Sequence, residues 1–218
     1  MPDLSRQINE LHFENAKGVL QSRLFAGGGY LVFPGWISET ALDGLLAEAK
    51  TSRPTAIRCS VPHSDSTEGR GGSPARAFRS GPGRDLHRRL YASPQMAEAL
   101  GRLCSAAVAA TGGGTYSYYE QTGDFLAVHR DVVKCDIAVI TCLSSSDAGR
   151  SDGGLLVYPG HLGEPLSKVR AAGTSAGIPV PLRRGETAVL LGGILPHEVT
   201  PLAMGQERIV SINCYHIL

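Results

Sequence analysis

The sequence lacks the features that mark several classes of protein. Its 218 residues hold 21 basic and 20 acidic side chains, so no overall charge attracts it to nucleic acid or an acidic membrane surface. The five cysteines are odd in number and show no CxxC spacing, which argues against a disulfide framework or structural zinc and favours reduced thiols. The N-terminus has no basic-then-apolar leader pattern, and no apolar run reaches the ~18 residues of a membrane span. We therefore expect a cytoplasmic protein with no nucleic-acid or membrane partner.

Glycine is abundant, with 27 residues, which favours turns and β-structure. Helices are expected at 4–24, from a Ser38 cap to about Lys50, and from Ser93 and Pro94 to the glycines at 112–114. Strands are expected at 29–33, 115–120, 125–131, 136–143, 154–159, 187–193, 195–202 and 207–218. Helices followed by a run of short strands predict a β-sandwich or barrel buttressed by helices.

Residues 51–89 differ from the rest of the chain. They are rich in Gly, Ser and Pro, and they carry eight arginines against three acidic residues. One interpretation is a mobile surface loop, and the other is a lid that meets an anionic group of a substrate. The arginines lack the interleaved aromatic residues of a base-stacking surface, which argues against a nucleic-acid substrate.

The stretch HRDVVKCDIAVITCL at 129–143 raises two alternatives. The first three residues match the start of a protein-kinase catalytic loop, but that loop requires Asn five residues after its Asp, and Asp136 stands there. No DFG, VAIK or APE motif is present. In a strand, residues i and i+2 project from one face with Cα atoms roughly 6.5 Å apart. His129 and Asp131 can therefore converge on a metal ion.

A second histidine and an arginine extend this pattern. His197 lies among apolar residues in GILPHEVTPL, where an ordinary core histidine would look similar. Arg208 follows eleven residues later and shares a face with apolar residues of the strand expected for ERIVSINCY. A buried guanidinium is costly unless a carboxylate pairs with it, so the carboxylate of a ligand is a natural partner for Arg208.

Together, His129-x-Asp131, the distant His197 and Arg208 resemble the Fe(II)/2-oxoglutarate-dependent oxygenases. The similarity is greatest to the prolyl-hydroxylase-like branch and covers roughly residues 115–218. Three further stretches support it, namely YEQTGDFLAVHRD, GGLLVYPG and RRGETAVLLGGILPHEVTPL.

The resemblance implies a fold that is mainly β with flanking helices, namely a double-stranded β-helix, the jelly-roll or cupin-like barrel. It implies a single domain over residues 1–218. In that domain, 1–114 would supply helical support and the Arg/Gly-rich loop, and 115–218 would form the jelly-roll core.

The resemblance also implies a metal site. Two histidines and one carboxylate occupy one face of an Fe(II) octahedron and leave three positions open. His129, Asp131 and His197 are the expected ligands. In the family, 2-oxoglutarate and dioxygen fill the open positions, and decarboxylation of 2-oxoglutarate generates an oxidant that abstracts hydrogen from a C–H bond.

Two residues are expected to bind 2-oxoglutarate. Arg208 matches the residue that pairs with its distal carboxylate. Tyr119 is a candidate hydroxyl donor, although Tyr116 and Tyr118 compete and a core tyrosine is the ordinary interpretation. Many relatives have Ser two residues after the Arg, where this chain has Val210. A second hydrogen bond to that carboxylate must come from elsewhere or be absent.

The expected reaction is hydroxylation or a related oxidation such as desaturation, epoxidation or ring closure. Halogenases of this class replace the carboxylate with Ala or Gly, whereas Asp131 is present. The short chain favours a small-molecule substrate, such as an amino acid or a biosynthetic intermediate. A peptide or protein hydroxylase is the alternative within the class, and a noncatalytic jelly-roll binding module is the alternative outside it.

Overall fold

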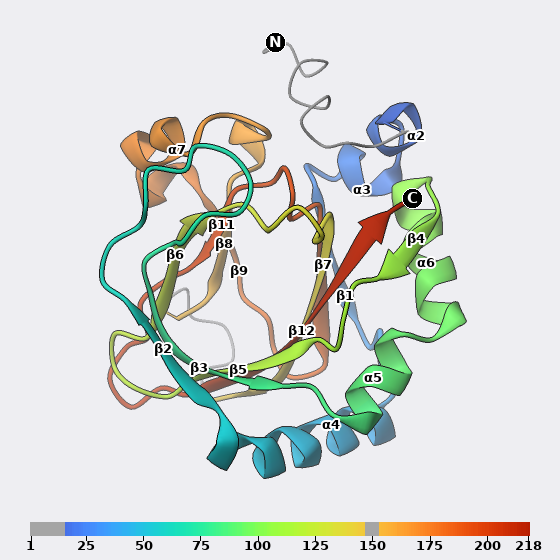
Figure 1. Ribbon diagram of the computed structural model, residues 1–218, viewed down its shortest axis with the longest axis vertical. Helices are drawn as coiled ribbons and strands as arrows, with labels where there is room; N and C mark the ends of the chain where they lie inside the picture. Colours follow the sequence, from blue (N-terminus) through green and yellow to red (C-terminus); the bar gives the residue numbers. More distant parts are fainter. Residues whose placement is uncertain (1–15, 147–152) are drawn as a thin grey trace.

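The computed structural model describes residues 16–146 and 153–218, and its centre is a curled, twelve-stranded antiparallel sheet (Figure 1). The hydrogen-bonded order is β1-β10-β7-β12-β5-β3-β6-β11-β8-β9, with β2 added at β3 and β4 at β12. The strands are β1 (Tyr30–Pro34), β2 (Ile57–Val61), β3 (Arg76–Pro82), β4 (Val108–Ala110), β5 (Thr115–Tyr119), β6 (Phe125–His129), β7 (Ile137–Ser145), β8 (Leu155–Val157), β9 (Ile178–Val180), β10 (Glu186–Leu190), β11 (His197–Val199) and β12 (Arg208–Ile217). The mainly-β fold with flanking helices is confirmed.

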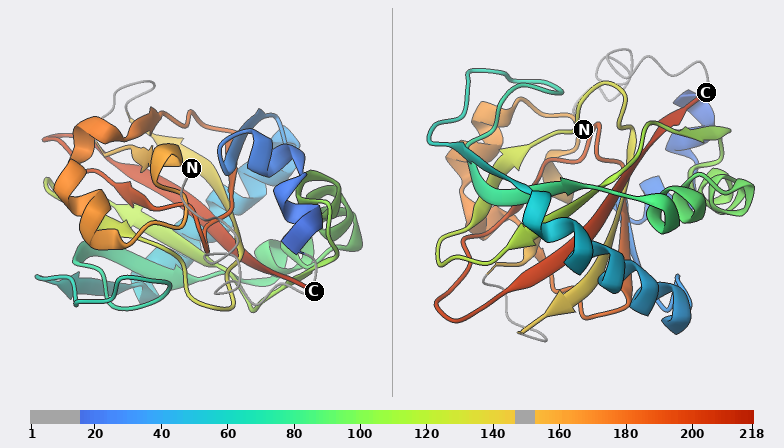
Figure 2. Two further views of the ribbon diagram at one scale, coloured as in Figure 1. Left: turned by 90° about the horizontal axis from the view of Figure 1, so that it is seen from above. Right: turned by 60° about the horizontal axis from the view of Figure 1, so that its bottom comes forward.

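Helices cover the outside of this curled sheet, as the two views of Figure 2 show. They are α2 (Ala16–Leu20), α3 (Arg23–Ala26), α4 (Glu39–Ser52), α5 (Asp85–Tyr91), α6 (Pro94–Cys104) and α7 (Leu166–Ala172), with 3-10 turns at η1 (Arg53–Thr55), η2 (Pro159–His161) and η3 (Thr174–Ala176). Ser38 caps α4 and Ser93 caps α6, each through a hydroxyl that accepts a backbone N–H, as expected. None of the described helices is long and apolar enough to cross a bilayer.

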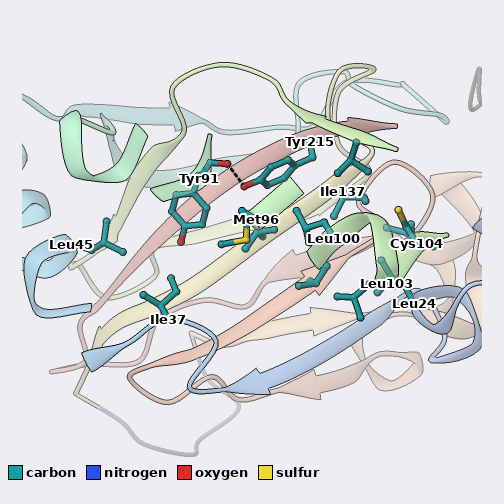
Figure 3. Packing of buried hydrophobic residues seen from close by; sticks show 14 of the residues in the cluster. Leu24, Ile37, Leu45, Tyr91, Met96, Leu100, Leu103, Cys104, Ile137 and Tyr215 are labelled. Atoms are coloured by element: carbon teal, nitrogen blue, oxygen red, sulfur yellow. Dashed lines mark hydrogen bonds between the residues drawn. The ribbon is translucent and has the colours of Figure 1, made fainter. Parts of the chain in front are cut away.

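The two largest hydrophobic clusters form an outer and an inner layer on the sheet. The outer layer packs helices against one face of the sheet and includes Leu45, Leu100, Tyr91 and Tyr215, all at most 1% exposed. The Tyr215 hydroxyl donates to the Tyr91 carbonyl at 2.6 Å and so links β12 to the end of α5 (Figure 3). The inner layer lies inside the curl of the sheet, where the candidate site is found.

Two expected helices differ from the structure. In the described part of 4–24, the chain forms two short helices, because the Ser22 hydroxyl accepts the Phe25 N–H and starts a new helix; residues 4–15 lie outside the described residues. The helix that begins at Pro94 ends at Cys104, where Ser105 adopts a left-handed conformation with φ 58°. The following residues form β4 and pair with β12.

The mobile-loop interpretation of residues 51–89 is wrong. The segment contains the antiparallel β2–β3 hairpin and α5, and β3 lies between β5 and β6 in the sheet. Several of its arginines bind acidic residues of the same protein: Arg53 binds Glu120, Arg58 binds Asp124 and Arg70 binds Asp136. The irregular part is the connection from β2 to β3, residues 62–75, which we call the hairpin tip. It extends to α7 at the open end of the barrel (Figure 1).

The expectation of reduced thiols is wrong for one pair of cysteines. Cys135 and Cys214 form a disulfide across 79 residues, with Cα atoms 4.8 Å apart. Cys135 lies two residues before the start of β7, and Cys214 lies in the adjacent β12 opposite Ala138. Sequence spacing cannot reveal this pair, because the pairing of β7 with β12 brings the two residues together. The other three cysteines are free.

Candidate metal centre and adjoining pocket

The two histidines meet because their strands pair. β11 runs antiparallel to β6 with His197 directly opposite His129. Both side chains point into the curl of the sheet, and their ring centroids lie 4.3 Å apart. A cross-strand pair on one face therefore brings together residues that are far apart in the sequence.

Asp131 reaches the histidines from outside the strand ladder, which corrects the expectation of a single strand over 125–131. β6 ends at His129, and Asp131 lies in the connection to β7, where its N–H donates to the Gly192 carbonyl at 2.9 Å. Its Oδ1 lies 3.6 Å from His129 Nε2 and 3.9 Å from His197 Nε2. One donor atom from each of the three residues falls within 4.8 Å of the others.

Hydrogen bonds fix how the imidazoles are presented. His129 Nδ1 donates to the Ala127 carbonyl at 3.0 Å, and His197 Nδ1 donates to the Leu195 carbonyl at 2.9 Å. A carbonyl can only accept, so the proton of each neutral ring lies on Nδ1. Both Nε2 lone pairs are then directed at Asp131, as metal-binding histidines are commonly oriented.

Electrostatics favour the protonation states that bind a metal. Burial, together with the neighbouring His129, lowers the pKa of His197 to about 4, so this imidazole is neutral at physiological pH. Burial alone would raise the pKa of the Asp131 carboxyl. The two imidazoles and Arg70 outweigh that effect and hold the pKa below its usual range. A neutral His197 beside an ionised Asp131 provides donor states that a divalent cation requires.

The donor set fits a first-row metal ion such as Fe(II). Octahedral donors about 2.1 Å from an ion lie about 3 Å apart, so Asp131 Oδ1, at 3.6 Å and 3.9 Å from the two Nε2 atoms, would move closer to both of them on metal binding. The second oxygen of Asp131, Oδ2, is buried without a hydrogen-bond partner. A buried carboxylate oxygen in that state is costly unless a cation compensates it.

An apolar pocket adjoins this centre on the inside of the barrel. Its lining is mostly aliphatic and comprises Leu126, Ala138, Ile140, Leu155, Val199, Val210 and Ile212, together with Tyr119, Arg208 and the three metal-binding candidates. Arg208 is 6% exposed, and its Nη1 donates to the Gly153 carbonyl at 2.8 Å. Its Nε is buried without a partner, and no acidic side chain among residues 16–146 and 153–218 forms an ion pair with it.

Strand alternation distinguishes the residues that face this pocket. Tyr119 is paired directly with Arg208 across β5 and β12, and both line the pocket. Tyr116 and Tyr118 face the other way and donate their hydroxyls to α4, at Glu48 Oε1 and the Ala49 carbonyl. Of the three tyrosines, Tyr119 is the one that lines the pocket. Its role toward a ligand stays a prediction.

The inward face of β12 is also as expected. Arg208, Val210 and Ile212 line the pocket, whereas the Ser211 hydroxyl faces the outer layer and hydrogen-bonds with Tyr91 at 2.8 Å. Ser211 therefore does not replace the hydroxyl that Val210 lacks.

Sequence reasoning missed a group of residues behind Asp131. Arg70 of the hairpin tip contacts the backbone of the 130–136 connection and binds Asp136, while Gly192 and Gly193 pack against Asp131 and Arg70. The adjacent glycines in LLGGILPH were a usable signal, because paired glycines beside a metal-binding histidine indicate close backbone approach. Arg70 gave no signal among the seven other arginines of residues 51–89.

Comparisons with known proteins support the family resemblance. No protein-family model matches the sequence, and no curated protein does. Among solved structures, the non-haem 2-oxoglutarate-dependent epimerase SnoN of nogalamycin biosynthesis aligns with a TM-score of 0.68 and 16% identity over 99% of this chain and 82% of its own. A Pseudomonas putida prolyl-4-hydroxylase aligns with a TM-score of 0.59 and 16% identity over 89% and 96%.

A third neighbour is HygX from Streptomyces hygroscopicus, solved with nickel, 2-oxoglutarate and hygromycin B bound. It aligns with a TM-score of 0.62 and 14% identity over 89% of this chain and 86% of its own. These neighbours establish that the protein has the jelly-roll fold of the Fe/2-oxoglutarate-dependent oxygenases.

Proposed function

We propose that the protein is a non-haem Fe(II)- and 2-oxoglutarate-dependent dioxygenase that hydroxylates an aliphatic C–H bond of a small molecule. One observation carries this proposal. The donor atoms of His129, Asp131 and His197 converge beside an apolar pocket that also contains Arg208, a buried cation without an acidic partner among the described residues. The site thus offers both a place for a divalent metal and a counter-charge for a dicarboxylate.

Each residue has a defined task in this proposal. His129, Asp131 and His197 bind Fe(II), which, with 2-oxoglutarate and dioxygen, supplies the oxidising chemistry. Arg208 pairs with the distal carboxylate of 2-oxoglutarate, and Tyr119, its cross-strand partner in β5, donates its hydroxyl to the same molecule. The aliphatic lining excludes water, which strengthens that ion pair.

The substrate is proposed to be an amino acid or a biosynthetic intermediate. The neighbours SnoN and HygX support this class, because one is named for nogalamycin biosynthesis and the other was solved with hygromycin B. A peptide substrate is the second candidate, supported by the prolyl-4-hydroxylase and by a Trichoplax adhaerens prolyl hydroxylase solved with a peptide fragment. A noncatalytic binding module would not need this donor set.

The test is substrate-dependent formation of succinate from 2-oxoglutarate, measured under air with Fe(II) against separate panels of amino acids, metabolites and proline-containing peptides. His129→Ala, Asp131→Ala and His197→Ala should each abolish turnover, because each removes one of three protein ligands. His63→Ala, at an exposed position, should leave turnover unchanged. Full activity in any of the three ligand variants would contradict the metal assignment, and folded parent protein without Fe(II)-dependent turnover on either panel would favour the binding module.

A cytoplasmic location remains part of the proposal. The disulfide between Cys135 and Cys214 is unusual for that compartment, because disulfides persist mainly where conditions are oxidising. Alkylation of thiols at the moment of cell lysis, followed by mass spectrometry, tests the location: a pair that is reduced in the cell supports the cytoplasm, and a pair that is oxidised there argues against it.

A further inference from the structure

The connection from β6 to β7, residues 130–136, is held by a side chain from another part of the chain. Val132 and Val133 are 57% and 55% exposed, so their side chains do not anchor the connection in the core. Instead, Nη2 of Arg70 donates to the carbonyls of Val132 at 2.7 Å and Val133 at 3.0 Å. Nε of Arg70 makes a longer contact with the Asp131 carbonyl at 3.4 Å.

Arg70 is itself fixed in place. Its Nη1 pairs with Asp136 Oδ1 at 2.7 Å, and the two side chains are only 7% and 0% exposed. Asp136 also accepts the Ile217 N–H at 2.9 Å, which ties it to the end of β12. A Cβ at Gly193 would lie 2.7 Å from Arg70 Cζ, so the guanidinium lies directly against the glycine backbone.

The hairpin tip is joined to the same connection by its backbone. The Gly71 N–H lies 3.3 Å from the carbonyls of both Arg130 and Asp131. Arg130 Nη2 donates to the Glu68 carbonyl at 2.6 Å, and the Glu68 carboxylate accepts the Ser167 N–H at the start of α7 at 2.7 Å. The hairpin tip therefore lies between α7 and the segment that carries Asp131.

We propose that Arg70 is a positioning residue that sets where the Asp131 carboxylate lies relative to the two histidines. This inference rests on the proposed function, because it gives Arg70 a role toward the metal. Asp131 stands beyond the end of β6, with its N–H held by the Gly192 carbonyl and the carbonyls that follow it held by Arg70. Rotation of these peptide units would move the carboxylate, and Arg70 prevents that rotation.

A purely structural role for the Arg70–Asp136 pair predicts something different. Replacing a partner of a buried ion pair changes stability strongly, but it need not change the affinity of a nearby site. Outer-shell residues that orient a ligand typically change metal affinity by about 10–100-fold when they are altered. The affinity of the folded protein for a metal therefore separates the two roles.

The experiment is a calorimetric titration of the metal-free protein with Mn(II) under argon, which needs no substrate and no turnover. Arg70→Met should weaken Mn(II) binding about 10–100-fold. Arg70→Lys should lie between Arg70→Met and the parent, because an ammonium can keep the pair with Asp136 but cannot bind several carbonyls as a planar fork. Arg58→Met is the matched control: Arg58 is in the same hairpin and binds Asp124 at 2.6 Å, but no contact joins it to the 130–136 connection.

The outcomes separate the two proposals. Loss of Mn(II) binding in His129→Ala with parental binding in folded Arg70→Met would overturn the role of Arg70 and leave the proposed function intact. Parental binding in His129→Ala would overturn the proposed function itself. Circular dichroism and urea unfolding identify variants that do not fold. If Arg70→Met is one of them, Arg70→Lys decides, and parental affinity in that folded variant overturns the positioning role.

Discussion

Arg208 is the residue on which the assignment of the cosubstrate depends. It is buried, it uses Nη1 on the Gly153 carbonyl, and its Nε has no partner. A buried guanidinium with an unused donor is energetically unfavourable in an apolar pocket. Binding of an anion offsets this cost, so the pocket favours an anionic ligand.

Arg208→Met should weaken 2-oxoglutarate binding by roughly 10²–10³-fold. A hydrogen bond to a charged group contributes about 1.5–3 kcal/mol, an unmatched buried partner costs about 3–5 kcal/mol, and each 1.4 kcal/mol is about tenfold. Calorimetry with 2-oxoglutarate on the Mn(II)-loaded protein measures the change. Mn(II) binding itself should be unchanged, because Arg208 is not a ligand.

Arg208→Lys should recover part of the loss, since it keeps the charge but not the fork. Arg79→Met is a suitable control, because Arg79 donates to the Ala56 carbonyl and does not line the pocket. Equal affinity for 2-oxoglutarate in Arg208→Met and the parent would mean that the cosubstrate binds elsewhere or is another molecule.

The alternation of side chains along a strand correctly predicted which residues of β12 face the pocket. It placed Arg208 and Val210 on one face of β12 and Ser211 on the other, as observed. It could not choose Tyr119 over Tyr118, because alternation says that the two face opposite ways without saying which way is inward. That choice depends on the pairing of Tyr119 with Arg208, which is a property of the folded sheet.

At the scale of the element, the turn between β10 and β11 shapes the centre as much as the strands do. The Gly192 carbonyl accepts the Asp131 N–H at 2.9 Å, and the Gly193 N–H donates to the Asp136 carbonyl at 3.3 Å. A Cβ at Gly192 would lie 1.9 Å from Asp131 Oδ2, far inside contact distance. The absence of a side chain at residue 192 is thus what leaves room for the carboxylate.

Gly192→Ala should therefore displace the Asp131 carboxylate and weaken Mn(II) binding by about tenfold or more, the range seen when metal ligands lose their orientation. Calorimetric Mn(II) titration is the measurement. Gly160→Ala is the matched control, because nothing lies within 4 Å of a Cβ there and its φ is not positive. Parental affinity in Gly192→Ala would show that the carboxylate reaches the metal from another rotamer.

The β2–β3 hairpin could not be predicted from its residues. Arg58 and Arg79 are directly opposite each other in the hairpin, and like charges in that position are ordinarily destabilising. The fold overcomes this by giving each a separate acceptor, Asp124 for Arg58 and the Ala56 carbonyl for Arg79. Asp124 is 66 residues from Arg58, and Ala56 is 23 residues from Arg79. The local sequence therefore does not show that these two arginines can sit opposite each other in a hairpin.

At the scale of the molecule, the inner face of the sheet forms the candidate site and the outer face binds the helices. The inner face carries the metal centre and pocket, and the outer face is fastened to the helices by polar as well as apolar contacts. The Tyr91 hydroxyl meets both Thr141 and Ser211, and the Glu48 carboxylate accepts the Tyr116 hydroxyl together with backbone N–H groups at the start of α5. The stability of the whole protein therefore depends on buried polar groups remote from the site.

His87 makes this dependence testable through pH. The residue is fully buried between Tyr91 and Tyr116, its Nε2 lies 3.3 Å from the Ser211 hydroxyl, and its Nδ1 lacks a partner. Burial lowers the pKa of His87 from 6.5 to about 4, although the nearby Glu48 acts in the opposite direction.

Between pH 6.5 and about pH 4, His87 binds a proton in the unfolded chain but not in the folded protein. The free energy of unfolding therefore falls as the pH falls below 6.5, and the contribution of His87 to this fall is complete below about pH 4. From pH 7.5 to 5, His87 should lower the free energy of unfolding by about 2 kcal/mol. Urea unfolding at the two pH values, with a chelator present to remove metal, measures the change.

His197 contributes in the same direction, so the variant His87→Gln should lose about 2 kcal/mol of the pH dependence but not all of it. His63→Gln, at an exposed position, should keep the parent's full dependence. If His87→Gln keeps it as well, His87 accepts its proton in the folded protein, and the outer layer is more open to water than its burial indicates.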